Sequence, residues 1–358
     1  MQDLIDRLVR PEIQALRAYH VPEAAGLIKL DAMENPYPWP AELQAQWLDL
    51  LQATDINRYP HPQAPGVQAA LREAMGISDD MGLILGNGSD ELIQMLAMTV
   101  GGPGRKVLSL DPGFVMYRMI AVFTGTDYVG VPLRPDGFGL DLPAFLEAMD
   151  REQPVLTYIA YPNNPTGNLF PADEIIQIIE AAPGLVILDE AYAPFTDASF
   201  LSRLGHWPNL LVMRTVSKMG LAGLRLGYLA GPKGWVEQVD KTRLPYNINA
   251  LTQASAALAL RHHALFDAQT AAIRSERSRL FAALAGMDGV LPYLSEANFI
   301  LLRLTAGGAD RAFAGLRARG VLVKNLHDAH PLLSDCLRVT VGRPEEDDAF
   351  LAALADTL

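Results

Sequence analysis

Short, continuous runs of valine, isoleucine and leucine recur along the chain, and amphipathic stretches separate them. The runs occupy residues 107–111, 154–162, 184–192, 209–215 and 225–231. Continuous apolar runs of this length are typical of strands that are buried on both faces of a sheet. The stretches 91–98 and 171–182 carry apolar residues at helical spacing. Strand and helix in alternation predict an α/β sheet that is covered by helices.

The last third of the chain predicts a second, smaller α/β unit. Residues 250–285 contain neither glycine nor proline, which indicates one long helix or two. The segments 298–304, 320–325 and 336–342 are strand candidates with a helix between them. We therefore expect an N-terminal segment, 1–40, that packs on the small domain, a large domain, 41–250, and a small C-terminal domain, 251–358, that starts with the long helix.

The composition limits the classes of function. The chain has 358 residues, a formal net charge of −12 and one cysteine, Cys336, which excludes an intramolecular disulfide and fits a reducing compartment. We therefore expect a cytoplasmic protein. The acidic balance argues against binding nucleic acid, and no apolar run reaches the ~20 residues that cross a membrane. The histidines show no metal-binding spacing, so we expect no metal site, but a small anionic substrate is compatible with a few arginines gathered in one cleft.

Glycines lead into a predicted helix at GNGSDE, residues 86–91. Ser89 is a suitable N-cap, and the acidic residues after it suit the positive end of a helix dipole. A capped helix alone explains these residues. A glycine-flanked helix start also presents free backbone N–H groups, which can bind a phosphate. The pattern matches neither the nucleotide P-loop nor GxGxxG, so both interpretations stay open at this point.

Two further motifs follow apolar runs, where the strands of an open α/β sheet would end. YPNNPTG, residues 161–167, is either a simple turn or a pair of asparagine amides at the edge where ligands collect. In LDEAY, residues 188–192, Asp189 directly follows four apolar residues. We expect this carboxylate to be partly buried and to need a cationic partner. Tyr192 can reach the same cleft.

Lys218 lies in a glycine-rich turn within MRTVSKMGLAGLRLGY, residues 213–228. A surface lysine is one interpretation. The apolar flanks and the hydroxyls of Thr215 and Ser217 favour a desolvated lysine, whose lowered pKa makes it a nucleophile towards carbonyl groups. Such a lysine, an aspartate for a pyridinium nitrogen, and a helix start with hydroxyls and an arginine for a phosphate are what pyridoxal phosphate requires.

At these motifs the sequence resembles the class II, fold-type I aminotransferases that depend on pyridoxal 5'-phosphate, and among them the histidinol-phosphate aminotransferases. The resemblance covers nearly the whole chain. It is carried by MENPYP (33–38), NRYPHPQ (57–63), GNGSDE (86–91), DPGFVMY (111–117), YPNNPTG (161–167), LDEAY (188–192), RTVSK (214–218), GLAGLRLGY (220–228) and CLRVTVG (336–342). It implies a mostly parallel seven-stranded sheet covered by helices in the large domain, and a homodimer with sites at the interface.

The resemblance also implies roles for individual residues. Lys218 looks like the Schiff-base lysine, and Asp189 looks like the partner of the pyridine nitrogen. Asn164 and Tyr192 look like the pair that hydrogen-bonds the phenolic oxygen of the ring, and Tyr192 would be catalytic with Lys218 and Asp189. The other implied cofactor residues are Phe114, which would stack on the ring, Gly88, Ser89, Asp90, Ser217 and Arg225 at the phosphate, and Tyr59, which would reach the phosphate in the neighbouring subunit.

Substrate recognition would fall to Arg338, Tyr19, Asn35 and Asn164 in such a protein. Arg338 alternates with the apolar residues of its strand, so it points away from the apolar face. It points either into solvent or towards an anion, which the two parallel N–H donors of its guanidinium group (the guanidinium fork) can bind. Some relatives have a second arginine where this chain has Lys324. Lysine is a point charge without the fork, so Lys324 would hold a phosphate differently.

The resemblance implies transfer of the amino group of L-histidinol phosphate to 2-oxoglutarate, giving imidazole-acetol phosphate and L-glutamate, in histidine biosynthesis. An aromatic amino-acid aminotransferase and a threonine-phosphate decarboxylase are alternatives within the same fold. A non-catalytic regulator that binds pyridoxal phosphate is an alternative of another class. Such regulators carry an added DNA-binding domain, whereas this sequence has no spare basic helix-turn-helix segment.

Overall fold

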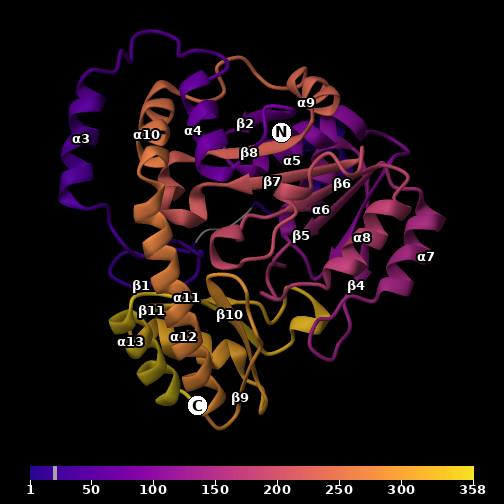
Figure 1. Ribbon diagram of the computed structural model, residues 1–358. Helices are drawn as coiled ribbons and strands as arrows, with labels where there is room; N and C mark the ends of the chain where they lie inside the picture. Colours follow the sequence, from indigo (N-terminus) through magenta and orange to yellow (C-terminus); the bar gives the residue numbers. More distant parts are fainter. Residues whose placement is uncertain (19–21) are drawn as a thin grey trace.

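The computed structural model describes residues 1–18 and 22–358, and its larger part is built on a seven-stranded sheet (Figure 1). The strand order is β2-β8-β7-β6-β5-β3-β4. All neighbours are parallel except at β8, Gly227–Pro232, which runs antiparallel to both β2 and β7. The other strands are β2 Met81–Gly86, β3 Lys106–Asp111, β4 Asp127–Pro132, β5 Leu156–Ala160, β6 Leu185–Asp189 and β7 Leu210–Thr215. The mostly parallel α/β fold that we expected is thereby confirmed.

All five predicted apolar runs of the large sheet form strands, but the sequence pattern missed the two edge strands, β2 and β4. In β4 the residues are mostly half-exposed, so the strand lacks a continuous apolar run. In β2 the apolar run is short and lies between Gly82 and Gly86. Gly82 is needed for packing, because a Cβ there would lie 2.7 Å from the Cβ of Val236 on the helix that covers it.

Helices cover both faces of this sheet, as the buried runs require. On one face lie α5 Ser89–Val100, α6 Val115–Thr124 and α9 Lys233–Asp240. On the other lie α4 Pro65–Met75, α7 Leu142–Glu152, α8 Ala172–Ala181 and α10 Ala250–Arg261, with α3 Ala41–Gln52 against α10. In β6, Ile187 faces the first layer, whereas Val186 and Leu188 face the second. Each such buried aliphatic side chain contributes about 1.5–3 kcal/mol relative to exposure.

The smaller part is built on a four-stranded antiparallel sheet with the order β12-β13-β10-β9. Its strands are β9 Val290–Pro292, β10 Phe299–Leu304, β12 Lys324–Asn325 and β13 Cys336–Thr340. The stretch without glycine or proline forms two helices, α10 and α11 His263–Ala285, and these run from the large sheet to the small one (Figure 1). The helices α12 Ala309–Ala318 and α13 Pro344–Ala355 complete this part.

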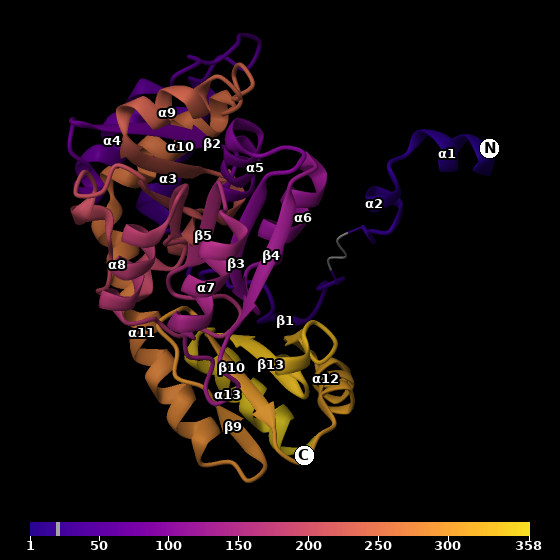
Figure 2. The ribbon, with the colours of Figure 1, turned by 90° about the vertical axis from the view of Figure 1, so that its right-hand side faces the viewer.

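The first forty residues contact both parts. Strand β1, Ile28–Lys29, pairs in parallel with β11, Val321–Leu322. Helices α1 Gln2–Leu8 and α2 Pro11–Gln14 extend away from both sheets (Figure 2), and the Arg10 guanidinium donates to the carbonyl of Phe123 on α6. Our division of the chain at residues 40 and 250 stays a prediction.

Short helical turns link the longer elements. They are Ala193–Phe195, Leu201–Arg203, Ser217–Leu221, Ala222–Leu224 and Pro331–Leu333. Among the described residues, no helix is both long and apolar enough to cross a membrane.

Candidate active site

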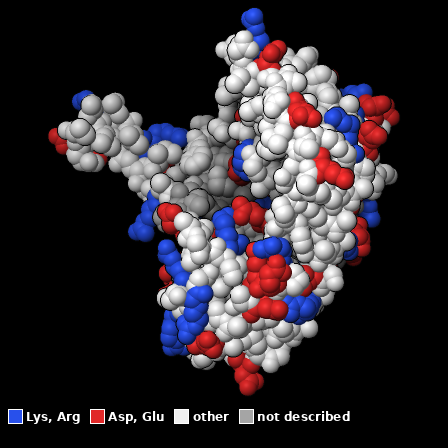
Figure 3. Space-filling view, turned by 90° about the vertical axis from the view of Figure 1, so that its left-hand side faces the viewer, with Lys and Arg blue, Asp and Glu red and all other residues white. Residues whose placement is uncertain are grey.

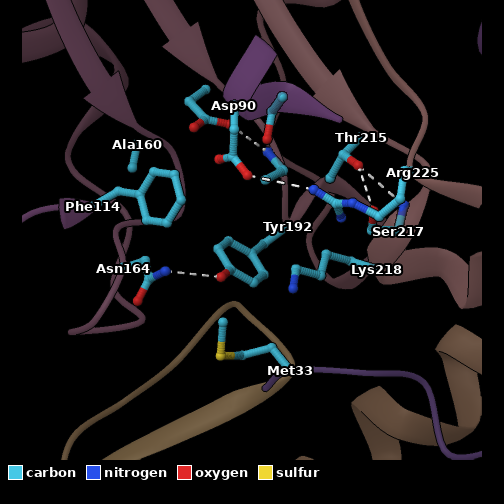
Figure 4. Close-up of a pocket in the computed structure, with 13 residues that line it drawn as sticks. Met33, Asp90, Phe114, Ala160, Asn164, Tyr192, Thr215, Ser217, Lys218 and Arg225 are labelled. Carbon is cyan, nitrogen blue, oxygen red and sulfur yellow. Dashed lines mark hydrogen bonds and ion pairs between the residues drawn. The ribbon is translucent and has the colours of Figure 1, made fainter. Parts of the chain in front are cut away.

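The carboxyl ends of the central parallel strands meet at the edge of the large sheet that faces the small sheet. In the register, Asp189 at the end of β6 lies between Ala160 of β5 and Met213 of β7. A pocket of about 570 Å³, with its mouth included, opens at this edge (Figure 4). It is lined by Met33, Ser89, Asp90, Phe114, Ala160, Asn164, Asp189, Ala191, Tyr192, Thr215, Ser217, Lys218 and Arg225. Most of the predicted cofactor residues therefore share one cavity.

Lys218 lies at the floor of this pocket, in the helical turn that follows β7. Its Nζ donates to the carbonyl of Ala32 at 3.2 Å and lies 5.9 Å from the ring centre of Tyr192. Burial of the ammonium group and, after it, the positive charge of Arg338 lower the pKa of Lys218 to about 8. This is the desolvated lysine that its apolar flanks predicted.

Asp189 is buried at the back of the pocket, only 3% exposed. Its Oδ2 accepts the hydroxyl of Tyr117 at 2.7 Å, and its Oδ1 accepts the backbone N–H of Ala191 at 3.1 Å. Burial raises the pKa of Asp189 to about 6, although these two hydrogen bonds act in the opposite direction. We expected a cationic partner for Asp189; among the described residues it is the adjacent Glu190 that pairs with an arginine, Arg214, whose Nη2 lies 2.6 Å from Glu190 Oε2.

One end of the pocket gathers groups of the kinds that can bind anions (Figure 4). Helix α5 begins here, and its N-cap is Gly88 rather than the predicted Ser89, which is the first helical residue. The guanidinium of Arg225 lies over this helix start, with Nη2 3.4 Å from Asp90 Oδ2. A Cβ at Gly88 would lie 2.6 Å from the same Nη2, and the φ of +84° there also favours glycine. The hydroxyl of Ser217 opens into the same space.

The middle of the pocket has aromatic and amide walls. Phe114, the N-cap of α6, contributes one ring, and Tyr192 contributes another. The amide Nδ2 of Asn164 donates to the hydroxyl of Tyr192 at 3.0 Å. The structure thus places Asn164 and Tyr192 side by side, from the loops after β5 and β6.

Arg338 reaches this region from the small sheet. It is 7% exposed, so it is not a solvated strand arginine. Its Nη1 donates to Asn164 Oδ1 at 2.5 Å and its Nη2 donates to the carbonyl of Asp31 at 3.1 Å. Lys324 is its register neighbour on β12, and both line a second, larger cleft that shares Phe114 and Asn164 with the first. Burial and the charge of Arg338 lower the pKa of Lys324.

Two predicted residues, Asn35 and Tyr59, lie elsewhere. Asn35 donates its amide to the carbonyl of Met219 at 2.9 Å and to Gln269, so it anchors the turn of Lys218 from outside the pocket. Tyr59 is 82% exposed and stacks on Tyr246 with ring centres 4.5 Å apart. Tyr19 lies outside the described residues.

The sequence analysis missed some residues of the pocket. Met33 points its side chain up towards Tyr192 (Figure 4), and its backbone N–H donates to Thr340 Oγ1 at 3.0 Å. Met33 opens the MENPYP motif, which was a usable signal. Tyr117 lies behind the pocket and closes the DPGFVMY motif, but only the contact with Asp189 shows what it does.

Residues 25–354 match the family described as aminotransferase class I and II. The chain belongs to this family. It is 53% identical over 353 residues to histidinol-phosphate aminotransferase 2 of Nitrosococcus oceani, covering 99% of this chain and 98% of the relative. It is 51% identical over 354 residues to the histidinol-phosphate aminotransferase of Chromobacterium violaceum, covering 99% of both.

Solved structures agree with this assignment. The aminotransferase resembles the histidinol-phosphate aminotransferase of Sinorhizobium meliloti in complex with pyridoxal-5'-phosphate, with a TM-score of 0.86, 26% identity and coverage of 98% and 97% of the two chains. It also has the fold of an L-threonine-O-3-phosphate decarboxylase from Porphyromonas gingivalis, with a TM-score of 0.78, 22% identity and coverage of 92% and 98%. The resemblance seen in the motifs is confirmed, and the family depends on pyridoxal phosphate.

Proposed function

We propose that this aminotransferase transfers the amino group of L-histidinol phosphate to 2-oxoglutarate, yielding imidazole-acetol phosphate and L-glutamate, as a step of histidine biosynthesis. The observation that carries the proposal is identity of 51–53% over nearly the whole chain to proteins named for this activity. The pocket supplies the groups that such a reaction needs.

Three features of the pocket fit pyridoxal 5'-phosphate. Lys218 is an amine with a lowered pKa at the pocket floor. Asp189 is a buried carboxylate with two hydrogen bonds, so each oxygen keeps a lone pair for a further donor. The start of α5, the hydroxyl of Ser217 and the guanidinium of Arg225 form an anion site at which Gly88 leaves room for close approach.

The residues of this chain then have distinct tasks. The bound cofactor supplies an aldehyde for the substrate amine and a ring that accepts electrons. Lys218, neutral above its lowered pKa, would take the proton from the α-carbon of the substrate and deliver it to the cofactor side. Asp189 would hold a proton at the ring nitrogen, and Asn164 and Tyr192 would orient the ring through its phenolic oxygen.

The second cleft would hold the anionic end of each substrate. Arg338 offers a guanidinium fork, which suits both the phosphate of the amino donor and a carboxylate of 2-oxoglutarate. Lys324 adds a positive charge next to it on the neighbouring strand. Arg118 also lines this cleft, so its three cationic side chains outnumber the two carboxylates, Asp111 and Asp328, in a chain whose net charge is −12.

We further propose a cytoplasmic homodimer. Large apolar side chains are exposed on and near α3 and α10, namely Leu48, Ile56, Tyr59, Leu244, Tyr246 and Leu251. On the face that carries α3, charged side chains are more widely spaced in the upper part than in the lower part, where charges of both signs crowd together (Figure 3). A second copy would cover these side chains and place Tyr59 near its phosphate site. Light scattering tests this proposal, since a dimer has twice the chain mass of 39.0 kDa.

A half-reaction without keto acid tests the function. The purified enzyme with its cofactor is mixed with L-histidinol phosphate, L-phenylalanine or L-threonine phosphate, and conversion of the cofactor absorption band is followed. Fast conversion with histidinol phosphate alone supports the proposal. Conversion chiefly with phenylalanine would move the function to aromatic transamination, and loss of carbon dioxide from threonine phosphate would indicate a decarboxylase. No reaction with any amine would favour a regulator.

A further inference from the structure

Tyr117 is a buried residue that contacts the pocket from behind. Its side chain is 1% exposed, and it is not among the residues that line the cavity. Its hydroxyl donates to Asp189 Oδ2 at 2.7 Å. A phenol has one proton to donate, so this proton is committed to the carboxylate.

The ring of Tyr117 is held on two sides. It stacks on Tyr158 with ring centres 4.6 Å apart and planes 3° apart, and it meets the edge of Phe114 at 5.5 Å and 84°. Tyr158 is itself anchored, because its hydroxyl donates to the carbonyl of Ile93 at 3.2 Å. These contacts fix the direction of the Tyr117 hydroxyl, and they link it to the aromatic residue at the pocket wall.

We propose that Tyr117 is a positioning residue for amino transfer, whose hydroxyl keeps the Asp189 carboxylate charged and aimed at the ring nitrogen of pyridoxal phosphate. The inference rests on the proposed function, because Asp189 meets a ring nitrogen only when such a cofactor binds. A hydrogen bond donated to the charged form of an acid stabilises that form. Without it, burial would leave the carboxyl group protonated over a wider pH range.

The other groups around Asp189 do not replace this hydrogen bond. Asp90 on α5 and Glu190 after β6 are negative and raise the pKa of Asp189, as burial does. Tyr158 on β5 and Tyr192 after β6 are the other phenols near it, and Lys218 lines the same pocket. The backbone N–H of Ala191 is the second donor, and it is present in any side-chain variant.

The test measures binding of pyridoxamine 5'-phosphate to the cofactor-free chain by equilibrium dialysis across a range of pH. This probe has no aldehyde, so attachment to Lys218 does not enter the measurement. In the wild-type chain, binding weakens on the acid side as Asp189 takes a proton. We call the pH range over which binding falls away the acid limb of the profile. In Tyr117→Phe, the acid limb should move to a pH about one to two units higher, which is the effect of losing one hydrogen bond to a charged group.

Tyr158→Phe is the matched control. It removes a hydroxyl of the same kind at similar depth, but that hydroxyl bonds a backbone carbonyl instead of Asp189. Both variants should lose similar thermal stability, and only Tyr117→Phe should shift the acid limb. Titration of the probe itself is common to all three proteins, so it cancels in the comparison.

An acid limb of Tyr117→Phe that coincides with that of Tyr158→Phe would overturn the inference and leave Tyr117 a packing residue. Tyr117→His is the second variant, for the case in which Tyr117→Phe does not fold. It restores a ring donor and should return the limb to the wild-type position or below it, and a limb above the wild-type position would count against the proposal. Failure of the wild-type chain to bind the probe at any pH would refute the proposed function itself.

Discussion

Asp347→Asn is expected to change stability little below about pH 4, where the side chain is largely neutral in both states, and to make the protein increasingly more stable than wild type as the pH rises towards about 8. Asp347, on α13, is fully buried, and Glu276, on α11, is 7% exposed. The backbone N–H of Gly342 donates to Asp347 Oδ1 at 3.0 Å, and Arg279 donates to Glu276 at 2.6 Å. Burial first, and then Glu276, raise the pKa of Asp347. The Asp347 carboxyl group therefore keeps its proton at neutral pH.

The pKa of Asp347 gives the size of the effect. It is about 8 in the folded protein, whereas an aspartate in an unfolded chain titrates near 3.9. Between these values the folded state holds one more proton than the unfolded state. Stability is therefore lost as the pH rises towards the folded pKa, at about 1.4 kcal/mol per pH unit. From about pH 6 to about pH 8 the wild-type chain should lose roughly 2–3 kcal/mol through this group.

Asparagine removes this loss, because it is neutral throughout. Its Oδ1 can keep the bond from Gly342, and its Nδ2 is a donor that can bond the neighbouring Glu276 carboxylate. The other titratable groups near the pair are Arg279, Asp348, Arg343, Glu345, Glu346 and Tyr37, and they are the same in both proteins. The difference in unfolding free energy between variant and wild type therefore isolates Asp347.

Urea unfolding of the two proteins at a series of pH values measures this difference. Asp348→Asn is the control, since Asp348 lies on the same helix, is 65% exposed and also contacts Arg279. Its difference from wild type should be small and independent of pH. The reasoning is refuted if Asp347→Asn is destabilised by the same amount at acid and alkaline pH, since Asp347 would then carry no raised pKa.

Three further predictions concern the pocket. Reductive methylation of Lys218 in the cofactor-free chain, followed by mass spectrometry, should reach half its maximal rate near pH 8, because only the neutral amine reacts. Gly88→Ala should weaken cofactor binding at least about tenfold in equilibrium dialysis, because the methyl group would displace Arg225, whereas Gly66→Ala, with open space around it, should not. Arg338→Lys should raise the KM for both substrates by about tenfold or more in steady-state kinetics, because lysine has no bidentate fork. An unchanged KM would exclude Arg338 from anion binding.

The sequence predicted those site residues that directly follow apolar runs. Asp189 and Lys218 come after β6 and β7, and the carboxyl ends of neighbouring parallel strands necessarily lie at one edge. The edge strand β4 escaped prediction because its half-exposed residues carry no continuous apolar run. Tyr117 escaped because its partner is 72 residues away in the chain, and helical spacing identifies a buried face without identifying what it contacts. The ion pair of Glu190 with Arg214 escaped for the same reason.

The two sheets are joined at the pocket through one line of hydrogen bonds. Arg338 of the small sheet donates to Asn164 of the large part, and Asn164 donates to Tyr192 beside Lys218. The charge of Arg338 also lowers the pKa of Lys218, after burial. An anion bound at Arg338 offsets that charge, so the pKa of Lys218 must rise when the anion binds. Arg338, which we propose as the residue that holds the anionic end of the substrate, would therefore also adjust how readily Lys218 accepts a proton.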